Sequence, residues 1–444
     1  MKTRYRNFQE SGEKRIVVCG MGAVTTLGNY GPDNDELWRS LLAGKTGFRH
    51  LHPIDPQDPE NSFGIKAQVV GDLFGFDPEQ YKDDREWSRR PNFTGLDKAI
   101  QIGLVASNYA VSSLDMSKVD PERAAVSVGI GLGGGRSSEA SLKSFLARGP
   151  NIQMGNAVVN TMPNGLAGRA SICFQFKGPS FATPAACASS LYALFAACDM
   201  VKLGRTDVVL VIGTEACATP HYLATFQRIN ALTYSSSLNA SMPFGLGRDG
   251  FVMSEGAGAL IITSLEYAKK MGWPIVAEIA GYAANSGAQD IVVPNSQGTR
   301  RCMELALEDA RLDPAQIDAI NAHGTSTPEG DLREAEAISR VFGNDPSWNP
   351  FVWSTKANLG HLLGGAGMVE SIVSIMTLVT GKIHPMGEYA LDRDCLFPCT
   401  EATPNGLPLN IVTGGAELDK RRTAVMNSSF GFGDTNGSVI FTQV

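Results

Sequence analysis

The chain has 444 residues, 43% of them hydrophobic and 19% charged, and a formal net charge of −7 at pH 7. This length can bury one large core or two fused halves, and the acidic balance argues against general nucleic-acid binding. No uninterrupted apolar run reaches the roughly 20 residues that span a bilayer, and the N-terminus lacks the apolar centre of a signal peptide. We therefore expect a cytoplasmic protein that does not enter a membrane.

The eight cysteines are spread along the chain without a C-x-x-C pair, at positions 19, 173, 187, 198, 217, 302, 395 and 399. Their neighbours are mostly apolar. This usage is typical of reduced thiols and argues against a disulfide framework or a structural metal site. We expect no metal.

The first part of the chain predicts a tail and then an α/β half. Residues 1–14 are polar with mixed charge and are expected to form the tail, and residues 15–264 form the half. Apolar β-branched runs that begin near positions 15, 124, 206 and 257 predict buried strands, and helical periodicity is found over 32–43 and 96–114. Between them, 46–91 is rich in proline, aspartate and aromatic residues, which predicts a capping excursion.

The stretch 178–204 stands out within this half. Pro184 cannot continue a helix, the two alanines after it are small enough for a tight elbow, and Cys187 opens an Ala- and Leu-rich run with helical spacing. A thiol at a helix N-terminus is favoured as a thiolate by the unpaired amides and the helix dipole. A cysteine in an apolar helix is more often only a small buried residue. The residues around Cys187 therefore decide whether it is a nucleophile or only a small buried residue.

The second half, 275–444, repeats the pattern of the first. The passages 114–131 and 312–324 each contain a helix end, an acidic turn with proline and a buried strand that ends in glycine. The segment 424–441 repeats the arrangement of strand, small-residue turn and strand found over 207–262. The repetition predicts two duplicated α/β halves packed as layers in one body.

Two nucleotide-binding motifs are present only in part. A G-x-G-x-x-G pattern occurs twice, at 129–134 and 245–250, but the first lacks a following acidic strand end and the second does not open a helix. The tripeptide at 44–46 ends like a P-loop, but position 39 holds Arg39 where that motif requires glycine. The sequence therefore favours neither a dinucleotide site nor a phosphate loop.

Three further side chains could act in one reaction together with Cys187. His323 follows a buried strand in the run N-A-H-G-T-S-T-P, and Lys356 and His361 lie in S-T-K-A-N-L-G-H-L-L-G-G-A-G. A lone histidine at a strand end is usually structural. Two histidines that donate hydrogen bonds to a thioester carbonyl would stabilise an enolate, and a thiolate could hold the acyl group that the enolate attacks. This set of residues indicates decarboxylative carbon–carbon bond formation.

Two further motifs are R-D-G-F-V-M-S-E-G-A-G and N-S-S-F-G-F-G-D-T-N-G-S. With all these motifs, the chain resembles the β-ketoacyl-acyl-carrier-protein synthases of the type II elongating kind. The resemblance covers nearly the whole chain after the tail. The resemblance implies the thiolase-like fold, two βαβαβαββ halves in a layered α-β-α-β-α body. It implies condensation of an acyl chain on Cys187 with malonyl-acyl carrier protein, in fatty-acid or specialised polyketide or polyene synthesis. No cofactor is implied beyond the phosphopantetheine of the carrier.

The resemblance also assigns roles to individual residues. It implies that Cys187 is the nucleophile, that His323 and His361 assist decarboxylation, and that Lys356 supports His361. The amides of Cys187 and Phe432 are implied to form the oxyanion hole. The residues implied to contact the phosphopantetheine arm or the acyl chain are Thr325, Thr327, Phe430 and Leu132. Glu370 is implied to organise the catalytic residues from behind. A homodimer, or a heterodimer with a related subunit, is implied with Leu132 at its interface. For the acidic carrier, the exposed basic candidates are Arg85, Arg89, Arg90 and Lys98.

Three positions depart from the family's usual pattern. Gly245 stands where the family has aspartate, Gly287 stands where many members have aspartate, and Asp434 stands where they have glycine. The last two lie in loops that the resemblance assigns to gating of the acyl pocket. We expect the carboxylate to have moved from one loop to the other. Two other functions stay open: a coenzyme A-dependent thiolase, and a non-elongating partner subunit of a ketosynthase pair, which usually lacks the nucleophile.

Overall fold

The computed structural model describes residues 14–51, 64–81, 91–150, 155–343, 348–387, 409–412, 414–419 and 424–444. Most of the expected tail, parts of the excursion 46–91, the basic cluster Arg85, Arg89 and Arg90, and Cys395 and Cys399 lie outside these residues.

The apolar β-branched runs that begin near positions 15, 124, 206 and 257 all form strands, as the periodicity predicts. The strands are β1 (Ile16–Thr25), β2 (Gly28–Tyr30), β3 (Arg49–His50), β4 (Val69–Val70), β5 (Ala124–Gly129), β6 (Ser180–Thr183), β7 (Val208–Glu215), β8 (Gly256–Ser264), β9 (Ala277–Ser286), β10 (Ala319–Asn321), β11 (Phe351–Trp353), β12 (Lys382–Ile383), β13 (Asn410–Ile411), β14 (Ala416–Glu417), β15 (Ala424–Gly431) and β16 (Thr435–Thr442).

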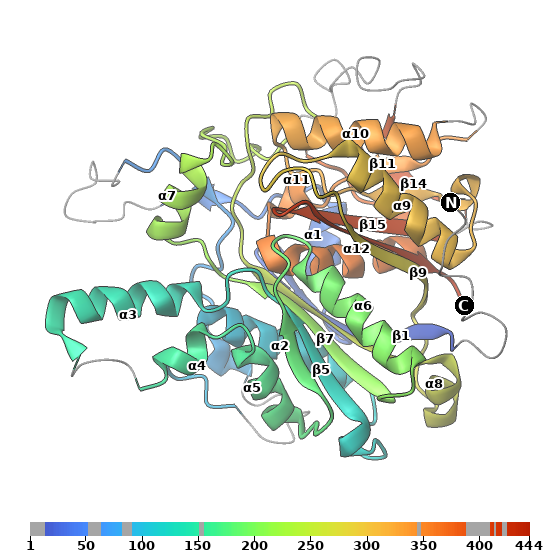
Figure 1. The fold of residues 1–444 in the computed structure, drawn as a ribbon, viewed down its shortest axis with the longest axis horizontal. Helices are drawn as coiled ribbons and strands as arrows, with labels where there is room; N and C mark the ends of the chain where they lie inside the picture. Colours follow the sequence, from blue (N-terminus) through green and yellow to red (C-terminus); the bar gives the residue numbers. More distant parts are fainter. Residues whose placement is uncertain are drawn as a thin grey trace.

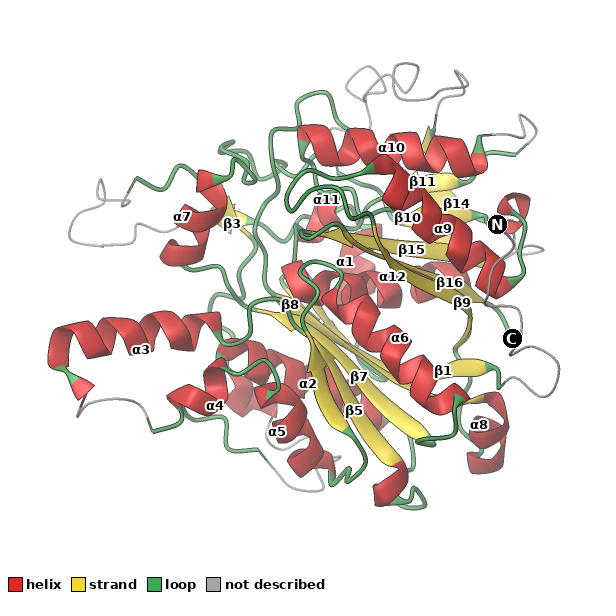
Figure 2. Cartoon of the chain, in the orientation of Figure 1, coloured by secondary structure: helices red, strands yellow, loops and turns green. Residues whose placement is uncertain are grey.

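The helices connect these strands (Figures 1 and 2). They are α1 (Glu36–Leu42), α2 (Lys98–Ser112), α3 (Gly135–Arg148), α4 (Ala157–Thr161), α5 (Gly165–Phe174), α6 (Ser189–Lys202), α7 (Pro220–Arg228), α8 (Leu265–Met271), α9 (Ser296–Ala310), α10 (Pro328–Phe342), α11 (Lys356–Leu359) and α12 (Ala366–Thr380).

The strand order shows the duplication directly. The first half runs β6-β5-β7-β8-β1 and the second runs β11-β10-β15-β16-β9. Numbered within each half, both orders are 3-2-4-5-1. In both halves strands 3, 2 and 4 are parallel and strands 4, 5 and 1 are antiparallel. The two first strands, β1 and β9, pair with each other at one end, so one hydrogen-bonded sheet runs through both halves.

Helices form the other layers. α6 and α12 contact strands of both halves and lie between them, whereas α2 covers the outer face of the first half and α9 that of the second. Two apolar cores result. One includes α6, α12 and the second half, and the other lies between α2, α5 and the outer face of the first half. The expected layered α-β-α-β-α arrangement is confirmed.

Helix α12 is buried on nearly every side, because protein surrounds it. The stretch Leu363–Thr380, which includes α12, is long and apolar enough to cross a membrane by length and composition, but 89% of it is buried inside the protein. It also carries Glu370, which is buried and ion-paired. This packing is consistent with the core helix of a soluble protein.

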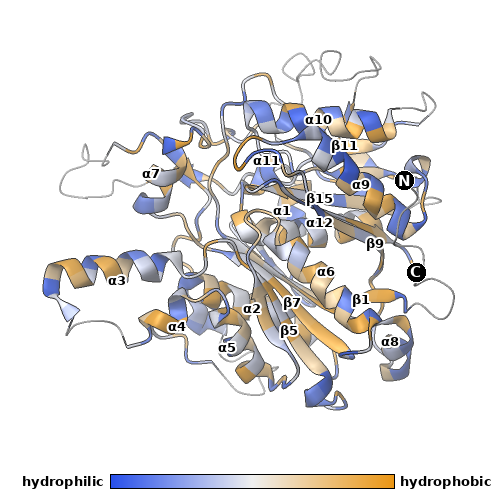
Figure 3. Ribbon diagram, viewed as in Figure 1, coloured by the Kyte–Doolittle hydropathy of each residue, from blue (hydrophilic) through white to orange (hydrophobic). Residues whose placement is uncertain are grey.

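One surface carries many apolar side chains. Helix α3 projects from the body beside α4 (Figure 1), and apolar and polar residues alternate along it (Figure 3). The apolar face, as we name it, comprises seven exposed residues on α3, α4 and α5 and beside them: Leu142, Phe145, Leu146, Val158, Val159, Met162 and Ile172. Nearby, β6 is the edge strand of the first half and pairs only with β5 among the described strands. Contiguous exposed apolar surface and an open strand edge are typical of an interaction site.

Candidate functional site

Cys187 occupies a tight elbow between β6 and α6. Ala186, directly before it, adopts a left-handed conformation with φ of 47°. The Ser189 hydroxyl closes the elbow, since it accepts from the Ala185 N–H at 2.8 Å and donates to the Ala186 carbonyl at 2.6 Å. Helix α6 begins at Ser189, two residues later than the sequence predicts, because the elbow takes up those residues. The thiol therefore projects from the turn rather than from the first residue of the helix.

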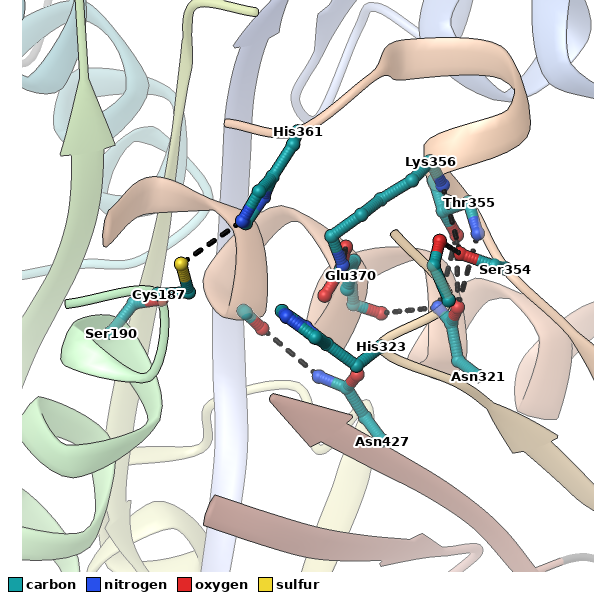
Figure 4. A network of polar contacts seen from close by, with 12 residues as sticks. Cys187, Ser190, Asn321, His323, Ser354, Thr355, Lys356, His361, Glu370 and Asn427 are labelled. Atoms are coloured by element: carbon teal, nitrogen blue, oxygen red, sulfur yellow. Dashed lines mark hydrogen bonds and ion pairs between the residues drawn. The ribbon is translucent and has the colours of Figure 1, made fainter. Parts of the chain in front are cut away.

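His361 reaches Cys187 from the second half. Its Nε2 lies 3.0 Å from the cysteine Sγ (Figure 4). Backbone hydrogen bonds hold the histidine on both sides, because its N–H donates to Val252 at 2.8 Å and its carbonyl accepts from Ser254 at 3.0 Å. The edge of the Phe251 ring packs against the imidazole at a centroid distance of 5.0 Å. The histidine is thus fixed by the strand-like segment before β8.

His323 completes a cluster of three. Its ring lies 5.3 Å from that of His361 and nearly perpendicular to it, and the reactive atoms of Cys187, His323 and His361 all lie within 4.8 Å of one another. The Glu334 carboxylate on α10 holds the turn, because it accepts the N–H groups of His323 and Gly324 at 2.7 Å each. The structure therefore brings together the three residues that the sequence analysis singled out.

A buried ion pair lies behind the histidines. The Lys356 ammonium contacts the Glu370 carboxylate of α12, and both side chains are almost fully buried. Asn321, at the end of β10, donates to the backbone carbonyl of Glu370 at 3.2 Å and to the Thr355 hydroxyl at 3.0 Å. This network fixes a positive charge beside the imidazoles (Figure 4).

Burial controls the protonation of the cluster. It lowers the pKa of both imidazoles well below 6.5, and the Lys356 ammonium lowers them further, so His323 and His361 are neutral. Burial also raises the pKa of the Cys187 thiol to about 12, although Lys356 acts in the opposite direction. Desolvation thus opposes the thiolate that we expected from the helix N-terminus, and it favours the neutral thiol. The resting pair is a neutral thiol and a neutral imidazole.

The cluster opens into a cavity of about 310 Å³ with mostly apolar walls. The loop of residues 292–295, Phe226 on α7 and the Phe430–Phe432 turn form much of the lining. Thr325 and Thr327 also line it, with their hydroxyl oxygens 2.9 Å apart. Two hydroxyls in an apolar cavity can orient a polar chain that reaches toward the thiol.

The turn after β15 lies against the cysteine elbow. A Cβ added at Gly431 would lie 3.0 Å from both the Cys187 nitrogen and the Ala185 carbonyl oxygen. The Thr435 hydroxyl donates to that carbonyl at 3.3 Å. The segment that carries Phe432 is thus held beside the Cys187 amide, where two N–H groups of an oxyanion hole would be needed.

The two unusual loops meet at Asp434. Its Oδ2 accepts the N–H of Gln289 at 3.1 Å, and its carbonyl accepts the N–H of Gly287 at 2.9 Å. A Cβ added at Gly287 would lie 2.1 Å from the same carboxylate oxygen, so the carboxylate occupies the space next to the glycine. Asp434 has a φ of 55°, in the left-handed region that aspartate tolerates better than most residues.

Two other expected residues, Lys98 and Leu132, each contact a buried glutamate. Lys98 pairs with the buried carboxylate of Glu255 at 2.7 Å and donates to the Leu73 carbonyl at 2.7 Å, so only 18% of its side chain is exposed. Leu132, in the glycine-rich loop after β5, is 40% exposed and its N–H donates to Glu215 at 3.2 Å. The basic cluster Arg85, Arg89 and Arg90 is outside the described residues.

Sequence reasoning did not identify the two buried glutamates that hold the site's turns. Glu334 lies 11 residues after His323, and Glu215 ends the apolar run of β7. The only signal in the sequence is an acidic residue at the end of a buried strand or at helical spacing from a glycine turn, which is a common pattern.

One cysteine and two histidines are also ligands that zinc accepts. The three reactive atoms are close enough to converge on one ion. The thiol and the His361 imidazole also lie 3.0 Å apart, within hydrogen-bond distance of each other.

Comparison with known proteins agrees with this geometry. Residues 13–268 match the beta-ketoacyl synthase N-terminal domain and residues 276–390 the C-terminal domain. The chain is 33% identical to 3-oxoacyl-[acyl-carrier-protein] synthase 2 of Vibrio cholerae, over 97% of this chain and all of that one.

Two solved structures at 26% identity each cover 98% of this chain and all of the other. The ishigamide ketosynthase/chain length factor superposes with a TM-score of 0.84. A type II PKS acyl-carrier protein in complex with its ketosynthase bound to the hexaketide superposes with a TM-score of 0.80. In sequence, fold and the convergence of a cysteine with two histidines, the chain belongs to the β-ketoacyl synthase family.

Proposed function

We propose that the protein elongates acyl chains by condensing an acyl group, held as a thioester on Cys187, with malonyl-acyl carrier protein. The observation that carries the proposal is the 3.0 Å contact between the Cys187 thiol and His361, with His323 in the same cluster. A nucleophile, two neutral hydrogen-bond donors and a nearby amide pair are the groups that this condensation requires.

The first step transfers the acyl group. The Cys187 sulfur attacks the carrier thioester, the carrier thiolate leaves and takes up the cysteine proton, and His361 keeps its own N–H throughout. Since both resting groups are neutral, neither Cys187 nor His361 carries a charge before substrate arrives. The Cys187 and Phe432 amides would receive the developing oxyanion.

The second step forms the carbon–carbon bond. The malonyl group loses carbon dioxide, and the N–H groups of His323 and His361 stabilise the enolate oxygen. The enolate carbon attacks the acyl carbonyl on Cys187, the cysteine thiolate leaves, and it takes up one proton from water, so each round of condensation consumes one proton. Lys356 and its partner Glu370 keep the imidazoles neutral and in place.

The carrier is the proposed partner, and its phosphopantetheine arm would pass Thr325 and Thr327. We propose no other cofactor, and a cytoplasmic location. The docking proposal rests on Arg85, Arg89 and Arg90, because the Lys98 ammonium is paired with Glu255. Charge reversal of the three arginines should raise the KM for an acyl carrier protein without changing Cys187 acylation by a small thioester.

We also propose that residues 15–264 and 275–444 act as two halves of one catalytic body, with a dimer built on the apolar face and the β6 edge. A related structure is a ketosynthase/chain length factor pair. The partner in the proposed dimer is therefore either a second copy of this chain or a related subunit. Light scattering of the purified chain distinguishes them, since a homodimer forms without any co-expressed subunit.

Two alternative functions are less well supported. A non-elongating subunit needs no nucleophile, but here the thiol is in hydrogen-bond contact with a histidine. A thiolase typically uses a second reactive cysteine late in the chain, and here Phe430 and Phe432 occupy the corresponding stretch.

Intact-protein mass spectrometry after incubation with a panel of acyl-acyl carrier proteins tests the proposal. We expect an acyl adduct on Cys187 that disappears when malonyl-carrier is added, with formation of a 3-oxoacyl carrier. If no member of the panel acylates Cys187 while coenzyme A thioesters do, the thiolase alternative is favoured.

A further inference from the structure

A buried carboxylate outside the proposed catalytic residues joins two turns of the site. Glu215 ends β7 and has no exposed surface. Its Oε2 accepts the N–H groups of Gly131 at 2.8 Å, Leu132 at 3.2 Å and Gly364 at 3.3 Å. Its Oε1 accepts the Cys217 thiol at 3.4 Å. One side chain therefore satisfies three amides from two segments that lie more than 200 residues apart in the chain.

The two turns are packed backbone against backbone around this carboxylate. A Cβ added at Gly364 would lie 2.2 Å from the Gly131 nitrogen and 2.8 Å from the carboxylate. A Cβ added at Gly131 would lie 2.9 Å from the carboxylate and 3.4 Å from the carbonyl of Ala186, in the cysteine elbow. The elbow, the loop after β5 and the turn after His361 thus converge on Glu215. Without an acceptor there, three N–H groups would lose this partner, and that of Gly364 is buried.

We propose that Glu215 is a positioning residue that fixes the turn after His361 relative to the Cys187 elbow and the Leu132 loop. The proposal rests on the proposed function. Gly364 is three residues after His361, so movement of this turn displaces the imidazole that serves the enolate. The acylation step depends mainly on the cysteine elbow, which Ser189 closes independently. Loss of the acceptor should therefore impair condensation more than acylation.

The protonation state of Glu215 does not alter this role. Burial raises its pKa to about 7, and the N–H of Gly131 acts in the opposite direction. A protonated carboxyl still offers its carbonyl oxygen to the amides. The neighbouring Cys217 is no rival nucleophile, because burial and then Glu215 raise the pKa of its thiol well above 9. Side-chain replacement therefore tests the role better than pH.

The test compares Glu215→Gln with Glu215→Met, which have similar volume and differ in the acceptor. In Glu215→Gln the amide oxygen takes the place of Oε2 and its NH₂ group faces the Cys217 sulfur. Both single-turnover steps are followed by intact mass: acylation of Cys187, and condensation of the isolated acyl-enzyme with malonyl-carrier. The matched controls are Glu122→Gln and Glu122→Met, at a carboxylate that is 70% exposed. Thermal unfolding of each variant is recorded beside the rates.

For Glu215→Met we expect condensation to fall on the order of tenfold to a hundredfold, the scale for a reacting group misplaced by about 1 Å. Acylation should fall much less, and Glu215→Gln should restore most of the condensation rate. Equal losses in both steps, or a glutamine variant no better than methionine, would overturn the proposal. If Glu215→Met does not fold, Glu215→Asp takes its place, because it withdraws the carboxylate by one methylene group. We again expect condensation to fall more than acylation. A wild-type enzyme that never becomes acylated contradicts the proposed function instead.

Discussion

Replacing Asp434 by glycine and Gly287 by aspartate, singly and together, tests whether one carboxylate joins the two loops of the cavity wall. Asp434→Gly removes a charge-assisted hydrogen bond to Gln289, worth about 1.5 to 3 kcal/mol. It also relieves a left-handed backbone that costs about 1 to 2 kcal/mol in a residue with a side chain. The net loss should be no more than about 2 kcal/mol.

Gly287→Asp in the native background should do more damage. Its Cβ would lie 2.1 Å from the Asp434 carboxylate oxygen, so the loop must shift, at a cost of about 1 to 3 kcal/mol for overpacking, and two carboxylates would compete for one site. The double variant removes the clash and returns a carboxylate to the same space from the other loop. We expect it to be close to wild type, with a coupling free energy of about 2 kcal/mol or more.

The assay is a double-mutant cycle on the Cys187 acylation rate, with the thermal midpoint measured in parallel. Asp115→Gly is the matched control, because Asp115 caps an exposed turn remote from the cavity and should not couple with Gly287→Asp. A coupling below about 0.5 kcal/mol would refute the reasoning, since independent sites are additive within that margin.

Four other outcomes are expected. Cys187→Ala should abolish condensation without unfolding the protein, and Cys187→Gln should release carbon dioxide from malonyl-carrier without elongation; an elongating alanine variant contradicts the assignment. His323→Ala and His361→Ala should still be acylated but lose decarboxylation on the order of a hundredfold, and near-normal turnover would make that histidine structural. Between pH 7 and 8 the free energy of unfolding should fall by up to about 1.4 kcal/mol per pH unit. The reason is that burial raises the pKa of Glu334 to about 8, so the folded state keeps a proton that the unfolded chain, with a pKa of 4.5, has released. A chemical-denaturation series checks this, and a rise in stability over that range contradicts it, because the buried neutral histidines lose stability only as the pH falls below 6.5. Treatment with a chelator should leave the rate unchanged, and loss of activity that added zinc restores would assign a metal to the cysteine–histidine cluster.

The elements of this protein were predictable where local pattern decides them. β1, β5, β7 and β8 lie where β-branched apolar runs occur, and α1 and α2 lie within the expected helical stretches 32–43 and 96–114. Local periodicity cannot place the boundaries at functional turns. α6 starts at Ser189 because the left-handed Ala186 and the Ser189 hydroxyl hold the elbow apart from the helix.

The sequence alone determined the residue types of the site, because Cys187, His323, Lys356 and His361 lie in distinctive turns and supply a nucleophile and two neutral donors. Only the tertiary structure decided their state and their distances. The raised pKa of the thiol depends on the protein packed around Cys187, which no local pattern contains. The amides that Glu215 accepts were invisible in the sequence, since a carboxylate binds whichever amides the packed layers bring within about 3 Å. The contact of Asp434 with the Gly287 loop, by contrast, was expected from the exchanged aspartate and glycine, and the structure confirms it. Long-range packing, not local sequence, makes those contacts.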